Sequence, residues 1–264
     1  MIRAIDWTAP WFLPWRDSGQ AVAHAVAREA AVHDALNAQG TAPVRFVAAS
    51  ELPPGAPYEL HIFRHGTCPT RGNLHDFFNG LVWLRFARSK QALNRLQAEE
   101  IVRSGVGARR GPVRDAITIF DENGALLHAP APLWEALRAR EWHRVFVELR
   151  PLWRKATVTV FGHALLEQLA APRKNLTAHV WCADAPGQRA ELDAWLADRM
   201  KPEALAAKPF TPLPVLGVPG WWPGNADESF YDDPLVFRPP PVLKQGLAAS
   251  SVAPGEFSSP TENP

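Results

Sequence analysis

A mainly apolar segment at residues 71–86 carries three polar residues, His75, Asp76 and Asn79, inside its hydrophobic run. Apolar residues flank these positions on all sides, which predicts a helix buried almost all round, with Asn73 as its N-cap. On this helix His75 and Asn79 are i,i+4 neighbours, and Asp76 and Asn79 are i,i+3 neighbours. Because buried polar groups need partners or a cavity, the helix either holds a hydrogen-bonded cluster or lines a site.

Helical and extended patterns alternate along the rest of the chain. Helices are expected at residues 17–37, 89–105, 132–140, 141–151, 163–170 and 188–200. Strands are expected at residues 44–48, 58–63, 157–161 and 177–182. Residues 116–128 read as a hairpin, because Asn123-Gly124 is a strong turn signal between two apolar runs.

The pattern predicts an α+β fold, with a small antiparallel sheet made from the hairpin and the two later strands and packed by helices. The segment 209–223 is rich in proline and tryptophan, so it is expected to be an extended C-terminal arm rather than a helix or a central strand. The composition turns to Pro, Ser, Gly and Ala after residue 238. We therefore expect one globular domain over 1–238 and a disordered tail over 239–264.

Composition excludes several classes of protein. The 264 residues carry a net charge of +1, so no overall field attracts nucleic acid or a membrane surface, and we expect neither as a partner. The two cysteines are too few for a disulfide framework and indicate free thiols in a reducing compartment. With no signal-peptide pattern and no run long enough to span a bilayer, the protein is expected to be cytoplasmic.

Histidines near carboxylates are the main candidates for chemistry. His163 follows a predicted strand and Gly162, which places it at a helix N-terminus, where the dipole disfavours imidazolium. Glu167 lies one turn later, and His179 lies in the next strand of the same predicted sheet. A neutral imidazole can bind a metal. We therefore predict that His75, His163 and His179 are ligands of a divalent metal such as zinc or manganese.

Further candidates surround this set. Asp76, Glu167 and Asp115 are candidates for catalytic acids, bases or additional ligands. Arg71, Arg114 and Asn79 are candidates for substrate binding, since arginine forks match carboxylate and phosphate groups. Cys68 is the one nucleophile candidate, because His65 and Arg71 nearby in the sequence would lower its thiol pKa.

Four sequence blocks occur together along the chain: NLHDFFNGLVWLRF, RGPVRDAITIFDENGALL, FGHALLEQLAAP and PLPVLGVPGWW. In this combination the chain resembles a bacterial family known as domain of unknown function 3025. The resemblance implies a soluble bacterial protein and brings no activity with it. Leu74 stands where the family pattern has Trp, and Ala87 where it often has Pro. Neither departure touches the polar candidates.

Two functions from different classes fit this sequence. The first is a metal-dependent hydrolase that acts on an anionic substrate in a His/Asp/Glu pocket. The second is a binding or scaffold protein, with a small-molecule or protein partner, whose buried His, Asp and Asn groups are structural. A convergence of the histidine nitrogens within reach of one metal would favour the first function, since zinc ligands lie within about 2.3 Å of the ion.

Overall fold

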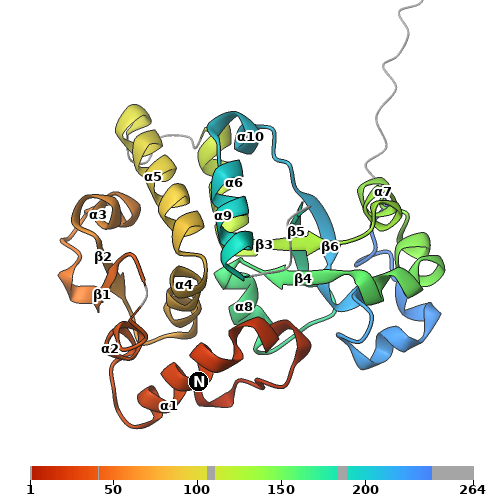
Figure 1. The fold of residues 1–264 in the computed structure, drawn as a ribbon, viewed down its shortest axis with the longest axis horizontal. Helices are drawn as coiled ribbons and strands as arrows, with labels where there is room; N and C mark the ends of the chain where they lie inside the picture. The colour runs from red at the N-terminus through yellow and green to blue at the C-terminus, as the bar shows by residue number, and fades with distance from the viewer. Residues whose placement is uncertain (1, 41, 106–110, 184–188, 240–264) are drawn as a thin grey trace, which may run out of the picture.

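The apolar segment forms helix α4 (Leu74–Arg85) at the centre of the molecule. Asn73 caps this helix as predicted, because its Oδ1 accepts a hydrogen bond of 2.8 Å from the amide of Asp76. In the computed structural model, the described residues are 2–40, 42–105, 111–183 and 189–239. Helix α4 lies between a small two-stranded sheet with its helices on one side and a larger four-stranded sheet on the other (Figure 1).

Helices and strands alternate irregularly along the described chain. The helices are α1 (Arg16–Ala27), α2 (Val32–Asn37), α3 (Tyr58–His65), α4, α5 (Ala87–Ser104), α6 (Pro112–Asn123), α7 (Ala131–Ala139), α8 (His163–Leu169), α9 (Arg189–Arg199) and α10 (Pro202–Ala206). The strands are β1 (Arg45–Ala48), β2 (Thr67–Thr70), β3 (Gly124–His128), β4 (Thr157–Val160), β5 (Thr177–Cys182) and β6 (Thr211–Pro214). Helices and two small sheets together make an α+β fold.

The larger sheet has the strand order β4-β3-β5-β6 and is mixed, so the expected antiparallel sheet is corrected. Strand β3 pairs antiparallel with β4 but parallel with β5, and β5 pairs antiparallel with β6. Strands β1 and β2 form a separate parallel pair. A parallel pair needs a long crossover, and between β3 and β5 the crossover contains β4 and helix α8.

The hairpin expected at residues 116–128 is wrong in its first half. Residues Pro112–Asn123 form helix α6, and only Gly124–His128 is a strand. The buried side chains of α6 include Val113, Ala116, Ile117 and Phe120, which are spaced at i, i+3, i+4 and i+7. Pro112 at the first helical position also favours a helix start. The helical period therefore prevailed over the turn signal at its end.

Two other expectations need correction in the N-terminal half. Residues 58–63 are not a strand but part of helix α3, which ends at Gly66 in a left-handed conformation with φ 64°. The single helix expected over 17–37 is two helices, α1 and α2. Glu29 between them has φ 71°, a conformation that interrupts a right-handed helix.

The proline-rich segment after residue 209 packs on the domain as expected, but part of it forms a strand. Strand β6 lies at the edge of the sheet, where prolines are tolerated because an edge strand leaves N–H positions unused. Leu213, Val215 and Leu216 behind it are fully buried. Of the tail predicted for 239–264, residues 240–264 lie outside the described residues.

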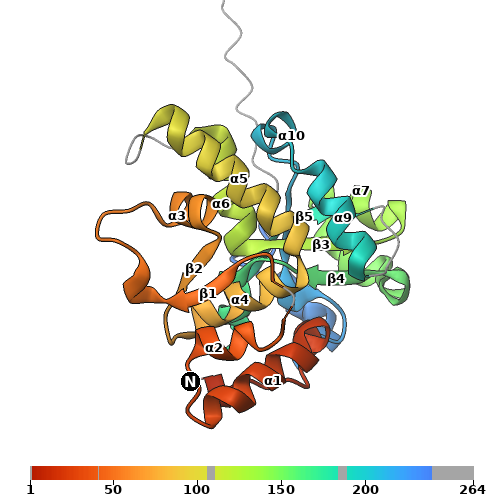
Figure 2. The ribbon, with the colours of Figure 1, turned by 60° about the vertical axis from the view of Figure 1, so that its left-hand side comes forward.

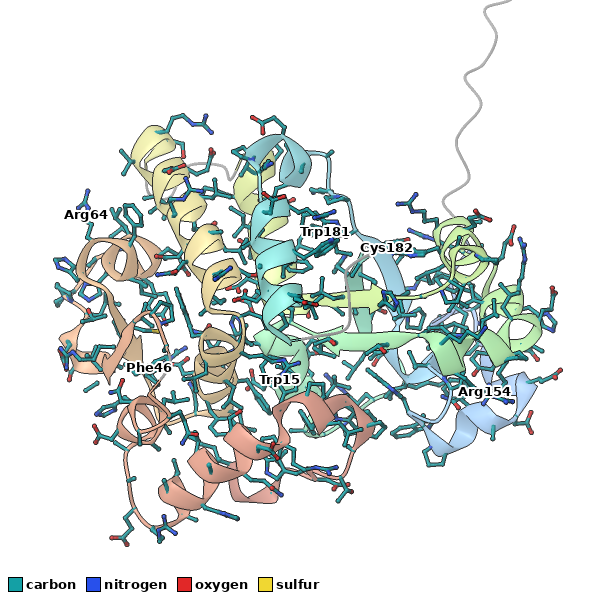
Figure 3. The ribbon with its side chains drawn as sticks, viewed as in Figure 1. Trp15, Phe46, Arg64, Arg154, Trp181 and Cys182 are labelled. Carbon is teal, nitrogen blue, oxygen red and sulfur yellow. The ribbon has the colours of Figure 1, made fainter. Side chains whose placement is uncertain are left out.

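Side chains from the N-terminal helices and from the larger sheet fill one continuous apolar core around α4. Figure 2 shows α4 and α5 between the β1–β2 pair and the larger sheet. Trp15 and Phe46 are buried in this core, whereas Arg64 points outward from α3 (Figure 3). In the described ranges, no helix combines the length and the apolar character that crossing a bilayer requires.

Candidate metal centre

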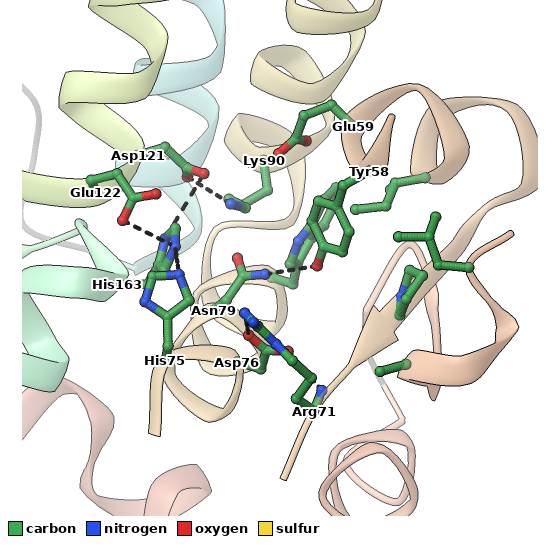
Figure 4. Close-up of a pocket in the computed structure, with 15 residues that line it drawn as sticks. Tyr58, Glu59, Arg71, His75, Asp76, Asn79, Lys90, Asp121, Glu122 and His163 are labelled. Atoms are coloured by element: carbon green, nitrogen blue, oxygen red, sulfur yellow. Dashed lines mark hydrogen bonds and ion pairs between the residues drawn. The ribbon is translucent and has the colours of Figure 1, made fainter. Parts of the chain in front are cut away.

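A cavity of about 440 Å³ lies beside α4 (Figure 4). This volume is in the range of small-molecule sites. Residues of α3 and β2 line one side of the cavity, and residues of α5, α6 and α8 line the other. Its charged and polar lining comes from five helices and from the loop before α4: Tyr58, Glu59, Arg71, His75, Asp76, Asn79, Lys90, Asp121, Glu122 and His163. Apolar side chains complete the wall: Ala49, Leu52, Ile62, Pro69 and Trp83.

His75 and His163 meet at one end of this cavity. His75 lies in the first turn of α4, and His163 is the first residue of α8, directly after the Gly162 cap. Their Nε2 atoms are 3.1 Å apart, and their rings meet edge to face. The two histidines are 88 residues apart in the sequence, so the packing of α4 against α8 is what brings them together.

Glu122 completes the group from the last turn of α6. Its Oε2 lies 3.4 Å from His163 Nε2, and one ligand atom each from Glu122, His75 and His163 falls within 4.8 Å of the others. Two ligands of a tetrahedral zinc at about 2.1 Å from the ion are about 3.4 Å apart. The spacing of these three side chains therefore fits a metal held by two histidines and one carboxylate.

Gly162 allows this close approach of α6 and α8. The amides of Phe161 and Gly162 both donate to the carbonyl of Gly124, at 2.9 and 2.8 Å. A Cβ on Gly162 would lie 2.4 Å from the carbonyl oxygen of Glu122 and 2.5 Å from the amide nitrogen of Asn123. Backbone therefore packs on backbone here, and only glycine fits.

Replacing Gly162 with alanine is expected to lower the free energy of unfolding by about 2–3 kcal/mol, because the added methyl must push two backbone segments apart. Urea denaturation measures the effect. Gly72→Ala is the matched control, since a Cβ on Gly72 meets nothing within 4 Å. Equal stabilities of the two variants would show that the junction relaxes without cost.

The hydrogen bonds of the histidines leave an excess of acceptors. His75 Nδ1 lies 3.0 Å from Glu167 Oε2, so we assign the proton of the neutral ring to Nδ1 and a lone pair to Nε2. Only the Nε2 proton of His163 then remains for two acceptors, His75 Nε2 and Glu122 Oε2. The other nitrogen, His163 Nδ1, is buried and faces Asp121 Oδ2 at 3.8 Å, which is too long for a hydrogen bond. A cation in contact with His75 Nε2, Glu122 Oε2 and His163 Nε2 would relieve this shortage, with the proton of His163 on Nδ1, toward Asp121.

The protonation state of His163 suits a ligand. Burial lowers the pKa of His163 to about 4, and the nearby charges of Lys90 and His75 act in the same direction, although Asp121 opposes them. The imidazole is therefore neutral near pH 7, as metal binding requires. Glu167, behind His75, has the position of an outer carboxylate that orients a ligating histidine.

A buried lysine balances part of the negative charge next to this group. Lys90 Nζ lies 2.6 Å from Asp121 Oδ1 and 5.3 Å from the centre of the Trp83 ring. Burial raises the pKa of Asp121, but Lys90 and His163 lower it more, so that it lies below its ordinary value. Burial is the main cause that raises the pKa of both Glu59 and Glu122, and the negative charge of Asp121 is the second. The carboxylates thus outnumber the cations that face them.

Asp76 is bound by the chain itself. Arg71 donates to it from Nε at 3.0 Å, from Nη2 at 2.8 Å and from the backbone amide at 2.6 Å. Asp76 is buried, whereas 62% of the Arg71 side chain is exposed. The predicted catalytic role of Asp76 remains a prediction, and in this structure its contacts anchor Arg71 at the edge of the cavity.

Asn79 lines the cavity one helical turn after His75, as the spacing predicted. Its Nδ2 donates to Tyr58 Oη at 3.3 Å, and this hydroxyl also contacts Cys68 Sγ at 3.2 Å. Asn79 Oδ1 is buried without a hydrogen-bond partner in the described chain.

Cys68 has the opposite character from the expected nucleophile. It is buried, and burial raises its thiol pKa to about 11, although the Tyr58 hydroxyl and Lys90 oppose the shift. At pH 8 only about 0.1% of such a thiol is ionised, since each pH unit below the pKa lowers the thiolate fraction tenfold.

We expect iodoacetamide to label Cys182 well before Cys68 in the folded protein. Peptide mass spectrometry measures both, the unfolded protein is the control, and equal labelling rates would contradict the prediction.

Four predicted site residues do not line this cavity, and one of them is Glu167, which lies behind His75. His179 is on β5 and is not part of the group formed by His75, Glu122 and His163. Burial, and secondly the charge of Lys208, lowers its pKa. Asp115 forms an ion pair with Lys208, and both are about half exposed. Arg114 is buried in α6 and does not line the cavity.

Five of the polar lining residues were not among the predicted site residues: Tyr58, Glu59, Lys90, Asp121 and Glu122. Two of these omissions follow from reading 116–128 as a hairpin, which placed Asp121 and Glu122 in an exposed turn. The helical spacing of Val113, Ala116, Ile117 and Phe120 was the signal that could have placed both carboxylates at a helix end. For Lys90, the sequence offers no comparable signal.

Comparisons with known proteins add a family to this geometry. A search of curated proteins and a search of solved structures found no match. The sequence profile of one family, described as "Protein of unknown function (DUF3025)", matches residues 44–240, well over half of the chain. This match covers the helices that carry His75, Glu122 and His163. The chain therefore belongs to the DUF3025 family, as its sequence blocks suggested.

Proposed function

We propose that this protein is a metal-dependent hydrolase whose metal ligands are His75, His163 and Glu122. The convergence of these three side chains at one end of a cavity is the observation that carries the proposal. Two histidines and one glutamate form a known ligand set of hydrolytic zinc sites, which keep a further position for water. Compared with the set expected from sequence, Glu122 replaces His179.

The charge of the cavity supports a divalent cation. Four carboxylates line it, Glu59, Asp76, Asp121 and Glu122, against the two cations Arg71 and Lys90. With all six ionised and the histidines neutral, the lining has a charge of −2. A divalent ion would cancel this charge, and uncompensated charge in a partly buried site is unfavourable.

The chain would contribute orientation and electrostatics to the reaction. A bound zinc supplies an activated water by lowering its pKa to about 7. Glu167 keeps the Nδ1 proton of His75 in place, so that Nε2 faces the cavity. Lys90 holds positive charge beside Asp121. Arg71 keeps exposed N–H groups at the edge of the cavity, where they would bind an anionic group of the substrate.

A metal-dependence screen tests this function. Protein stripped with chelator and reloaded with zinc or manganese is assayed against chromogenic phosphoesters, carboxylic esters and amides. We expect hydrolysis of one class in a loaded form, loss of at least about 100-fold in the stripped protein, and recovery on reloading. Activity that is the same with and without metal would contradict the proposal.

The alternative is a binding or scaffold protein, and a specific observation favours it as second candidate. Asp76 and Asp121 both have close cationic partners within the chain, as expected for structural groups. This function predicts a well-folded protein that takes up no metal.

A further inference from the structure

Asn79 lines the cavity and carries an unused acceptor. Only 7% of this residue is exposed, and its Oδ1 has no hydrogen-bond partner in the described part of the chain. In Figure 4 the amide nitrogen is turned toward Tyr58, and the oxygen is turned away from the tyrosine. Buried carbonyl groups of side chains are normally paired, so this oxygen is suited to accept from a ligand.

Tyr58 fixes the orientation of this amide. Its hydroxyl accepts from Asn79 Nδ2 and has Cys68 Sγ as its other close polar contact. Since the hydroxyl has a single proton, which the sulfur can accept, the amide nitrogen remains the donor in the pair. Tyr58 is therefore a positioning residue for Asn79.

The cavity follows one face of α4. His75, Asn79 and Trp83 all line it, at positions i, i+4 and i+8. Four residues of an α-helix rise about 6 Å. Asn79 therefore lies about 6 Å along the helix from His75, and Trp83 lies a further turn along. A ligand bound at His75 and extending along α4 would reach Asn79 with its next polar group.

The other polar groups of the lining favour a donor on the ligand. Lys90 is bound to Asp121, and two of the nitrogens of Arg71 are bound to Asp76. Glu59 contributes a further acceptor, and within the described ranges its carboxylate accepts a hydrogen bond from Asn94 Nδ2 at 3.1 Å. Beyond the metal ligands, the interior of the cavity therefore has more acceptors than free donors.

We propose, on the basis of the function proposed above, that the substrate is a small molecule with an amide or amine N–H about one helical turn from the reacting bond, and that Asn79 Oδ1 accepts this hydrogen bond. An anionic group on the same substrate would lie toward Arg71, at the edge of the cavity. Asn79 is thus a specificity-determining residue, because a substrate without the donor leaves its oxygen unpaired.

Three thiol probes of similar length test this assignment in protein loaded with cobalt(II). They are 3-mercaptopropionamide, its methyl ester counterpart methyl 3-mercaptopropionate, and 3-mercaptopropionate. Each binds the metal through sulfur, which gives a thiolate–cobalt absorption band for titration. We expect the amide to bind about tenfold more tightly than the ester, which corresponds to one hydrogen bond.

Variants assign the preference to Asn79. Asn79→Leu is expected to retain the cobalt band but to bind amide and ester within about twofold of each other. Asn79→Asp, which has only acceptors at this position, should keep the amide preference and guards against a folding defect in the leucine variant. Tyr58→Phe should reduce the preference without weakening the ester.

The outcomes separate this inference from the proposed function. If cobalt binds but amide and ester bind equally to the wild type, the inference is wrong and the metal site stands. Tightest binding of the carboxylate probe would also overturn it, in favour of an anion at this position. An amide preference that survives in Asn79→Leu would assign the donor to another acceptor. If no cobalt is bound, both the proposed function and the inference fail.

Discussion

Replacing His163 with alanine is expected to abolish stoichiometric metal binding. The wild type, purified without chelator or affinity tag, should contain about one zinc or manganese ion per chain, and the variant less than about a tenth of that. The reason is geometric, because His163 Nε2 is the atom that lies close to both other members of the group, at 3.1 Å from His75 Nε2 and 3.4 Å from Glu122 Oε2. Elemental analysis measures the content.

Two further variants identify the ligand set. Glu122→Gln should lower metal affinity by at least about 100-fold, since loss of even an outer-shell partner costs about 10–100-fold. His179→Ala is the matched control, because His179 is a histidine of the same chain outside the three-residue group. Metal lost in His179→Ala but kept in Glu122→Gln would restore the ligand set expected from sequence and overturn the one proposed from the structure.

The fold of each variant has to be checked separately. His163 is buried, so its removal leaves a small cavity and frees Glu122 from a neighbour. Circular dichroism and thermal unfolding of metal-free samples distinguish a misfolded variant from a folded one that lacks a ligand. A wild type that is well folded and free of metal would favour the scaffold function instead.

Replacing Lys90 with methionine is expected to lower the free energy of unfolding of the metal-free protein by about 3 kcal/mol or more. The Lys90 side chain is 6% exposed and that of Asp121 19%, so the pair is shielded from water. Methionine keeps the apolar stem but leaves Asp121 without its cation, beside Glu59 and Glu122. Urea denaturation, monitored by tryptophan fluorescence, measures the loss.

A second change tests whether the loss comes from the orphaned charge. Asp121→Asn in the Lys90→Met background should recover part of the stability, because a neutral amide costs less to bury than a carboxylate. Lys208→Met is the control for removing a lysine from an ion pair. Lys208 and Asp115 are 46% and 45% exposed, so this change should cost less than about 1 kcal/mol. Equal losses at Lys90 and Lys208 would contradict the argument.

Local sequence patterns determined several parts of this protein correctly. The apolar run with Asn73 before it predicted helix α4 and its cap, and Gly162 before His163 predicted the start of α8. Strand β5 also lies where its alternation predicted. Such features depend on residues close in the sequence, so propensity, period and capping are sufficient to find them. On the same basis His75 and His163 were chosen as ligands, and they lie together.

Tertiary packing decided the parts that depend on distant residues. At residues 112–123 the turn signal of Asn123-Gly124 competed with a helical period, and the burial of Phe120 in the core goes with the helix. Because residues 112–123 are helical, Glu122 lies in the last turn of α6, beside His163. The parallel pairing of β3 with β5 likewise joins segments between which α7, β4 and α8 lie in the sequence, and no local pattern specifies it.

The sequence by itself therefore determined the central helix, the family and two of the three proposed ligands. Only the tertiary structure decided that Glu122 rather than His179 joins them, and that Lys90 is buried against Asp121. The physical reason is that a side chain's type and helix position are local properties, whereas its neighbours depend on how buried faces pack. In this chain the close backbone packing of Gly162 on Glu122 brings the third proposed ligand to the other two.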